Sequence, residues 1–359
     1  MMSGVEGLSY FRTNSKGIRG EEFPQSREKS YLILTVGGST TENFWLDQAK
    51  AWPALVQMDL VSTADGRQVW VGNVGKAGMT TRDHVLQVRY LLPQYPKIDV
   101  LILLAGINDF ELRLRQGSLY DPNYLERPGA EAMQMRHAFS LVPEEVYDLP
   151  WYKKTGLWRV ARAIRSRIGS DGAANQIIGL AVTEVPLPRS GVQNGYDRPS
   201  FVADMRHLRQ NAVEILGELP DLTSALGEYE KNLNRIIDTA QERGVRIVLV
   251  THPAMWRADL NQYEKSLLWF GAADLGFSRY YSFQALAKGM NEYNARMLKV
   301  CAERRVECID LAAQLPKNTS AFFDDVHFNE NGARLVTRAI ASALRAAPPF
   351  VLKASSSGR

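Results

Sequence analysis

The sequence predicts an α/β fold: a doubly wound (flavodoxin-like) five-stranded parallel sheet in an α/β/α sandwich. Two observations lead to this prediction. Short continuous apolar runs, typical of strands buried on both faces, alternate along the chain with amphipathic helical patterns. Each helical pattern is long enough to form the crossover that joins two parallel strands. We also expect a helical and irregular insertion between the third and fourth strands.

The strands are predicted from five apolar runs bounded by turn residues. Such runs favour a parallel sheet, because helices cover both of its faces. The first four runs are continuous and the fifth is shorter. They span residues 31–36, 69–74, 100–104, 245–250 and 306–311.

The helices are predicted from apolar residues that recur at helical spacing between these runs. The first pattern carries Pro53 in its first turn, where a missing backbone N–H costs nothing. The last pattern is amphipathic and follows an Asn-Glu-Asn start. The patterns span residues 52–60, 81–92, 222–243, 283–304 and 332–344.

About 140 residues separate the third and fourth strands, far more than one crossover needs. We interpret residues 111–243 approximately as an insertion that forms a cap or subdomain over one sheet edge. The rest of the chain divides into a lead-in over residues 1–30, a single domain over residues 31–350 and a tail over residues 351–359. A second irregular region, residues 255–283, is rich in aromatic side chains.

The composition excludes several classes of protein. With 45% hydrophobic and 23% charged residues among 359, the chain is neither disordered nor fibrous. The formal net charge is +4 and the basic residues are scattered, which argues against a nucleic-acid partner. No apolar stretch reaches the length of a signal peptide core or a membrane span. We expect a soluble protein with no membrane span.

The two cysteines, Cys301 and Cys308, are too few for a disulfide framework and lack the spacing of zinc ligands. We expect two buried thiols. Histidines and cysteines never recur at metal-ligand spacing, and neither the dinucleotide-binding glycine pattern nor the phosphate-loop motif is present. The sequence therefore predicts no metal and no cofactor.

Four small or polar clusters follow predicted strands or lie near the C-terminus. In doubly wound sheets, ligands bind beyond the carboxyl ends of the strands. We therefore expect the clusters to share one functional edge. They are residues 37–41 (Gly-Gly-Ser-Thr-Thr), 73–80, 105–109 (Ala-Gly-Ile-Asn-Asp) and 324–328 (Asp-Asp-Val-His-Phe).

These clusters supply the parts that acyl transfer needs: a nucleophile, a base, a group that orients the base, and oxyanion donors. Ser39 would stand on a tight strand-to-helix turn as the nucleophile. His327 would take its proton, and Asp324 would orient the imidazole. The oxyanion donors would be the backbone N–H groups of Ser39 and Gly78 and the side-chain amide of Asn108.

The four clusters, in this order, resemble the sequence blocks of the SGNH (GDSL-type) hydrolase superfamily, bacterial type. Gly37-Gly38-Ser39 is similar to its Gly-Asp-Ser block, with Gly38 in place of the usual Asp. The resemblance implies an esterase fold with a Ser–His–Asp triad, and it extends over about half of the chain. Residues 14–21 are similar to the lead-in of members that carry an upstream membrane anchor. The compartment therefore stays open between the cytoplasm, expected from this sequence, and the cell envelope, if an anchor precedes it.

Other residues compete for some of these roles. Asp325 and Asp310 are alternatives to Asp324 as the orienting acid, but Asp325 has the wrong spacing and Asp310 fits a turn or cap. His252 follows the fourth strand and either lines the pocket or is a hydrogen-bonded structural imidazole. Asp109 is expected to support the Asn108 loop. We expect His84, His137 and His207 at the solvated surface, and the aromatic groups around residues 151 and 269 in core or cap packing rather than an acyl pocket.

The function predicted from the sequence is hydrolysis of carboxylic esters through an acyl-enzyme. The expected substrate is a small-molecule or saccharide ester, with short acyl groups such as acetyl on a carbohydrate or small alcohol. Three alternatives stay open: an O-acyltransferase that uses the same triad, a lipid esterase or lysophospholipase, and a non-catalytic binding module.

Overall fold

The computed structural model describes residues 2–7, 9–95, 97–139, 198–274 and 276–351. All five predicted strands are present, and they form one parallel sheet in the order β2-β1-β3-β5-β7. This is the strand order of flavodoxin-like proteins, so the predicted fold class is confirmed. The strands are β1 (Ser30–Gly37), β2 (Gln68–Asn73), β3 (Val100–Leu104), β5 (Arg246–Val250) and β7 (Glu307–Ile309).

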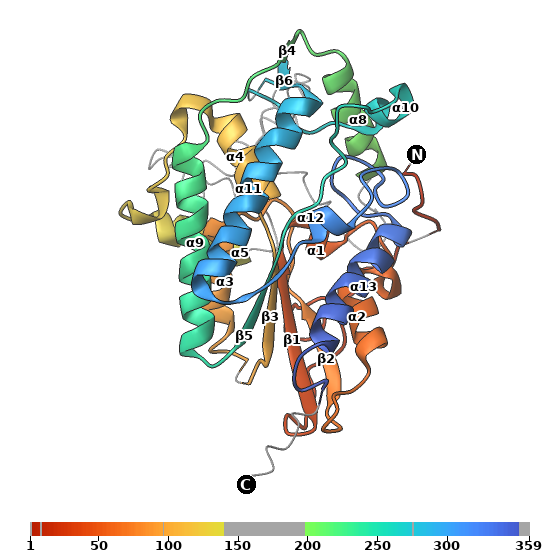
Figure 1. Cartoon of the computed structure of the whole chain (residues 1–359), viewed down its shortest axis with the longest axis vertical. Helices are drawn as coiled ribbons and strands as arrows, with labels where there is room; N and C mark the ends of the chain where they lie inside the picture. The colour runs from red at the N-terminus through yellow and green to blue at the C-terminus, as the bar shows by residue number, and fades with distance from the viewer. Residues whose placement is uncertain (1, 8, 96, 140–197, 275, 352–359) are drawn as a thin grey trace, which may run out of the picture.

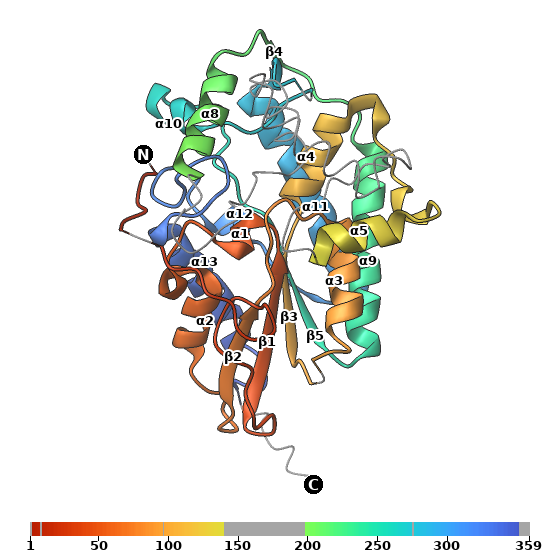
Figure 2. The same cartoon turned by 180° about the vertical axis from the view of Figure 1, so that it is seen from behind.

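Helices cover both faces of the sheet (Figures 1 and 2). On one face α2 packs against α13, and on the other α9 packs against both α3 and α11. Every residue of β1 and of β3 is buried between these layers, which explains why both strands are continuous apolar runs. These helices are α2 (Trp52–Leu60), α3 (Thr81–Leu91), α9 (Thr223–Glu242), α11 (Phe283–Arg304) and α13 (Glu330–Arg345).

Several shorter elements connect these layers. A second, two-stranded parallel sheet pairs β4 with β6 away from the main sheet. The shorter elements are α1 (Ser39–Glu42), η1 (Gln48–Lys50), α4 (Ile107–Gln116), η2 (Gly117–Leu119), η3 (Tyr124–Glu126), α5 (Ala130–Phe139), α8 (Arg198–Gln210), β4 (Glu214–Leu216), α10 (Gln262–Leu267), β6 (Arg279–Tyr281) and α12 (Leu311–Gln314).

The predicted insertion contains α4, α5, α8, β4 and the crossover helix α9. Its middle part, residues 140–197, lies outside the described residues, so the predicted cap stays a prediction. The aromatic group around residue 151 lies there too. No helix in the described part of the chain is both long and apolar enough to cross a membrane.

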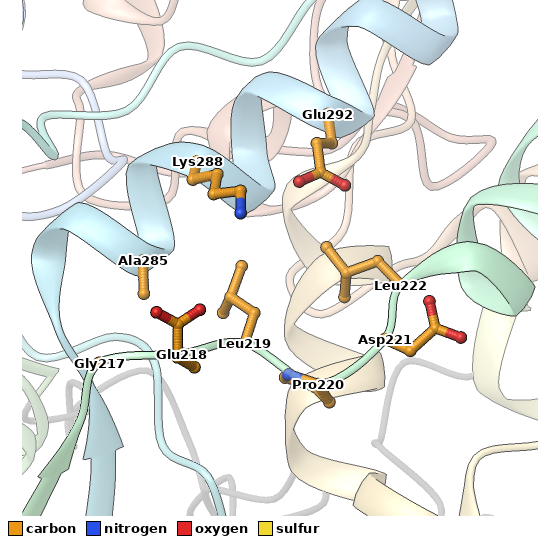
Figure 3. A pocket seen from close by; sticks show the side chains of 9 residues that line it. All are labelled: Gly217, Glu218, Leu219, Pro220, Asp221, Leu222, Ala285, Lys288 and Glu292. Carbon is orange, nitrogen blue, oxygen red and sulfur yellow. The ribbon is translucent and has the colours of Figure 1, made fainter.

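A hollow of about 210 Å³ lies between α11 and the segment that joins β4 to α9 (Figure 3). Its lining is mixed: Leu219 and Leu222 face Lys288 and Glu292 of α11. A wider hollow of about 550 Å³ lies along α11 and shares Lys288 and Glu292 with the first.

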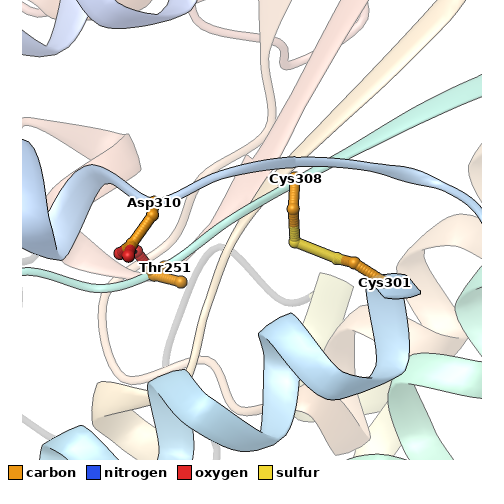
Figure 4. Close-up of a disulfide and its surroundings, with 4 residues drawn as sticks. All are labelled: Thr251, Cys301, Cys308 and Asp310. Atoms are coloured by element: carbon orange, nitrogen blue, oxygen red, sulfur yellow. A yellow bond between two sulfur atoms is a disulfide. The ribbon is translucent and has the colours of Figure 1, made fainter. Parts of the chain in front are cut away.

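The two cysteines form a disulfide, so the expectation of two buried thiols is wrong. Cys301 is in the last turn of α11 and Cys308 is in the middle of β7, with their Cα atoms 6.0 Å apart (Figure 4). This separation is ordinary for a disulfide. The bond joins the end of α11 to the edge strand that follows it.

Candidate active site

Ser39 is the first residue of α1, and only Gly38 separates it from the end of β1. The turn that carries it needs glycine at two positions. A side chain at Gly37 would overlap Thr41 Oγ1 and lie 2.6 Å from the carbonyl oxygen of Leu104. A side chain at Gly38 would overlap the Asn108 amide nitrogen. In this chain, therefore, Gly38 packs directly against the Asn108 amide, beside Ser39.

The structure brings Ser39, His327 and Asp324 together at the carboxyl edge of the sheet. Ser39 Oγ lies 2.8 Å from His327 Nε2, and His327 Nδ1 lies 2.8 Å from Asp324 Oδ2. All three residues are buried. Ser39 and His327 are 288 positions apart in the sequence. They come together because α13 packs onto α2, which places the loop before α13 next to α1.

The Asp324 carboxylate is held by its own turn. The backbone N–H groups of Val326 and His327 donate to Oδ1 at 3.0 and 2.9 Å. Burial acts to raise the pKa of Asp324, but the charge of His327 and these hydrogen bonds outweigh it, so the pKa lies below its ordinary value. A carboxylate with this pKa is ionised at neutral pH and can stabilise a positive imidazole.

Aromatic side chains surround the His327 ring. The ring centroids of Trp45 and Phe323 lie 4.5 and 5.7 Å from it. Trp269 stacks at 6.3 Å, and its indole N–H donates to Asp324 Oδ2 at 3.0 Å. The aromatic group around residue 269 was expected in core or cap packing. This expectation is incomplete, because Trp269 also contacts the acid of the site.

Asp325 has a different role from its neighbour Asp324. Its carboxylate accepts hydrogen bonds from the Trp256 indole N–H and the Trp269 backbone N–H, both at 2.6 Å. It also accepts one from the Phe270 backbone N–H at 3.2 Å. Burial and the charge of Asp324 raise the pKa of Asp325 to about 6. Asp325 thus anchors the segment that carries Trp269 and does not contact His327 directly.

Asn108, one of the predicted oxyanion donors, lies beside the turn that carries Ser39. Gly78 adopts φ +77°, a left-handed conformation that favours glycine, and its N–H has no hydrogen-bond partner among the described residues. Asn108, in the first turn of α4, donates one amide hydrogen to the Met79 carbonyl at 2.8 Å. That bond fixes the amide beside Gly38 and leaves its second hydrogen available.

The chain matches the GDSL-like Lipase/Acylhydrolase family over residues 35–335, which include the three clustered side chains. It belongs to this family. Membership makes it a carboxylic ester hydrolase, and we refer to it below as the esterase. No curated protein matches the chain.

Solved structures similar to the esterase have low sequence identity to it. The α/β hydrolase LAE5 from the metagenome of Lake Arreo is 13% identical, with a TM-score of 0.43, over 87% of this chain and 94% of that one. A lipolytic protein of the G-D-S-L family from Veillonella parvula is 11% identical (0.44, 87% and 97%). The acetylxylan esterase Axe2 from Geobacillus stearothermophilus is 14% identical (0.42, 88% and 95%). The family assignment rests on the family match alone.

His252 is a structural imidazole that supports α1. Its Nδ1 lies 3.0 Å from the Pro253 carbonyl, which requires the proton on Nδ1. Nε2 then accepts a hydrogen bond from the Thr40 hydroxyl at 3.0 Å. Burial lowers the pKa of His252 to about 3, so the ring is neutral. It holds the residue next to Ser39 and does not reach Ser39 itself.

Asp109 and Asp310 both anchor helix starts. Asp310 caps α12 by accepting from the Ala313 backbone N–H at 3.3 Å, as its sequence position indicates. Asp109 Oδ1 accepts from the backbone N–H and the hydroxyl of Thr81, which ties the start of α4 to the start of α3. Burial raises the pKa of Asp109 to about 7.

The surface positions expected for His84 and His137 are wrong. His84 is fully buried and shares a hydrogen bond of 2.8 Å with Gln87. His137 is buried in an ion pair with Asp83, with 2.7 Å between Nδ1 and Oδ1. The charged neighbours of His84, Arg82 and Asp83, are themselves buried. The expectation is confirmed for His207, which is exposed.

Arg19 is a supporting residue that sequence reasoning missed. It lies in the predicted lead-in, forms an antiparallel bridge with Asn73, and buries its guanidinium behind α1. Its two terminal nitrogens donate to the carbonyls of Asn43 and Leu46, each at 2.8 Å. A cation at this end complements the carbonyls that α1 leaves unpaired. Nothing in the sequence pattern distinguishes this arginine from the others of the segment.

Neither hollow along α11 is lined by a predicted site residue. Among the described residues, no three His, Cys, Asp or Glu side chains are grouped so that they could hold a metal ion. The candidate site is therefore the cluster at the carboxyl edge of the sheet.

Proposed function

We propose that the esterase cleaves its substrate through an acyl-enzyme on Ser39. The observation that carries this proposal is the 2.8 Å distance between Ser39 Oγ and His327 Nε2, with Asp324 on the other ring nitrogen. Ser39 attacks the ester carbonyl while His327 takes the hydroxyl proton. His327 then gives this proton to the departing alcohol, and Asp324 stabilises the imidazolium between the two transfers.

The negative oxygen of the tetrahedral intermediate is bound by three donors: the N–H groups of Ser39 and Gly78 and the free amide hydrogen of Asn108. Donors that are fixed before the reaction stabilise this charge without reorganisation. Water, activated by His327, then attacks the acyl-enzyme and releases the acid.

The preferred acyl group is short, such as acetyl, and the alcohol is a carbohydrate or another small alcohol. The aromatic side chains close to the His327 ring support this preference, because they restrict the volume beside the nucleophile.

The proposal is tested with p-nitrophenyl acetate, butyrate and octanoate and with glucose pentaacetate. We expect kcat/KM to fall from acetyl to octanoyl, and Ser39→Ala to lose almost all turnover while its thermal unfolding is unchanged. Wild-type turnover in Ser39→Ala would contradict the acyl-enzyme on this residue.

A second alcohol added to the assay competes with water for the acyl group. Transfer of more acyl groups to this alcohol than to water would identify a transferase instead.

A further inference from the structure

One face of α4 continues outward from the predicted oxyanion donor. Asn108, Glu111, Leu112 and Arg115 are spaced i, i+3, i+4 and i+7, which places them along the same side of this helix. Glu111 and Leu112 therefore lie about one turn, or ~5 Å, beyond Asn108. A substrate whose carbonyl oxygen meets Asn108 extends its remaining atoms along this face.

The Glu111 carboxylate lies on this face of α4 and has few polar partners. Its Oε1 pairs with Arg115 at 3.5 Å, and 20% of its side chain is exposed. This long ion pair is the one contact of its carboxylate among the described residues. The adjacent Phe110 and Leu114 are buried on the opposite side of the helix. The Glu111 side chain is thus only partly exposed, on the side of α4 away from Phe110 and Leu114.

The charges around Glu111 connect it with the site. Burial raises the pKa of Glu111, and the positive charges of Arg115 and His327 act against this. Arg115 itself is held over the Phe277 ring at 5.6 Å, which fixes the outer end of this face.

Two further polar atoms on this side have no partner within the described residues: the Tyr280 hydroxyl and Arg115 Nη2, both buried. Arg115 lies over the ring of Phe277, which stands three residues before Tyr280, so the segment that carries Tyr280 reaches the outer end of this face. Buried polar atoms normally have partners, so unmet hydrogen-bonding capacity next to Glu111 indicates a place for polar ligand atoms.

We propose that Glu111 binds the alcohol portion of the substrate and accepts hydrogen bonds from its hydroxyl groups, which selects polyhydroxylated alcohols such as sugars. This inference rests on the proposed ester hydrolysis at Ser39. A carboxylate that accepts hydrogen bonds from hydroxyls is a strong partner, because charge-assisted bonds exceed neutral ones. Leu112, next to Glu111 on the same face of α4, adds an apolar contact for a ring.

The test compares two acetate esters that differ in hydroxyl groups alone: 6-O-acetylglucopyranose and (tetrahydropyran-2-yl)methyl acetate. We expect wild-type kcat/KM to favour the sugar ester. Glu111→Ala should lower the ratio of the two kcat/KM values by about tenfold or more, and Glu111→Gln should lower it less, because an amide oxygen still accepts from a hydroxyl. Glu303→Ala removes a glutamate from another i,i+4 ion pair, with Lys299 on the exposed part of α11, and should leave both values unchanged.

An unchanged ratio in Glu111→Ala, or an equal loss with both esters, would overturn the proposal. Acetylcholine provides a third arm: a preference for it that both variants abolish equally would identify a cation, not a hydroxyl, as the partner. Failure of the proposed function gives a different result: Ser39→Ala would then hydrolyse both esters as fast as wild type, or wild type would hydrolyse neither ester above background.

Discussion

The esterase contains two buried Asp–His pairs with nearly the same geometry. In one pair His327 Nδ1 lies 2.8 Å from Asp324, and in the other His137 Nδ1 lies 2.7 Å from Asp83. Both aspartates are fully buried and both accept backbone N–H bonds at the start of a turn or helix. The local chemistry of the two acids is therefore the same.

The pairs differ in what lies beyond the imidazole. His327 Nε2 meets Ser39 Oγ at 2.8 Å, while His137 has no hydroxyl among its described partners. His137 instead joins α5 to α3, since Asp83 also forms the capping box of α3. A buried Asp–His pair is thus as suitable for holding two helices together as for catalysis. A nucleophile and oxyanion donors on the far side of the ring decide which role it takes.

Removing the two imidazoles gives the largest expected difference between the pairs. His327→Ala should lower kcat/KM for p-nitrophenyl acetate by about 10⁵-fold, because the base is lost. His137→Ala should change kcat/KM of the folded enzyme by less than about threefold, and should lower the free energy of unfolding by about 3 kcal/mol, because it leaves Asp83 unpaired. Steady-state kinetics and urea denaturation of both variants measure these two effects. Comparable losses of turnover in the two variants would contradict the different roles of the two pairs.

The oxyanion donors give the next largest effect. Asn108→Ala should lower kcat by about 10²–10³-fold, the usual cost of one oxyanion donor. Asn232 is a matched buried amide that donates to Thr81 at 3.1 Å near the second pair. Asn232→Ala should affect unfolding and leave kcat within about twofold. If Asn108→Ala retained wild-type kcat, its amide would have no part in the reaction.

Each aspartate also accepts a hydrogen bond from a side chain other than its histidine, and these bonds allow a finer comparison. Trp269 donates to Asp324 at 3.0 Å, and Gln134 donates to Asp83 at 2.5 Å. Trp269→Phe should lower kcat by about tenfold, the value of one hydrogen bond to a charged group. Gln134→Leu should lower the midpoint of urea denaturation and leave kcat in place. Steady-state kinetics on both variants decide between these roles, and equal kcat values for Trp269→Phe and wild type would make the indole contact purely structural.

Changing the acid of the second pair is expected to have the smallest effect on activity. Its effect is on the pH dependence of stability. Burial acts to raise the pKa of Asp83, but the charge of His137 and the hydrogen bonds of Asp83 lower it overall. A lowered pKa stabilises the folded state above the unfolded pKa of about 3.9, and this stabilisation is lost as the pH falls through the folded value. Asp83→Asn should therefore be less stable than wild type at pH 7, by about 3 kcal/mol, and the gap should narrow at pH 3. Urea denaturation at both pH values measures the gap; a gap that is constant or widens at low pH would contradict the assignment.

The sheet and the long helices could be predicted from the sequence because local patterns determine them. The runs that became β1 and β3 are apolar throughout since both faces are covered, and α11 was bounded correctly at Phe283 and Arg304. The glycine and polar clusters at strand ends also indicated which residues would meet, because parallel strands deliver their carboxyl ends to one edge.

Contacts between distant segments could not be predicted in this way. Charged neighbours suggested a solvated His137, yet Asp83 and His137 come from different helices that bury their charges against each other. The spacing of Cys301 and Cys308 does not reveal that the end of α11 turns back onto β7. Trp269 reaches Asp324 because Asp325 anchors its backbone, a relation with no local signature.

Labelling with a fluorophosphonate tests most directly whether the Ser39–His327 contact creates an active nucleophile. Peptide mass spectrometry should find one adduct, on Ser39, formed at the same rate in wild type and His137→Ala and far more slowly in His327→Ala. An adduct on another residue, or a His327→Ala enzyme that labels as fast as wild type, would contradict the account.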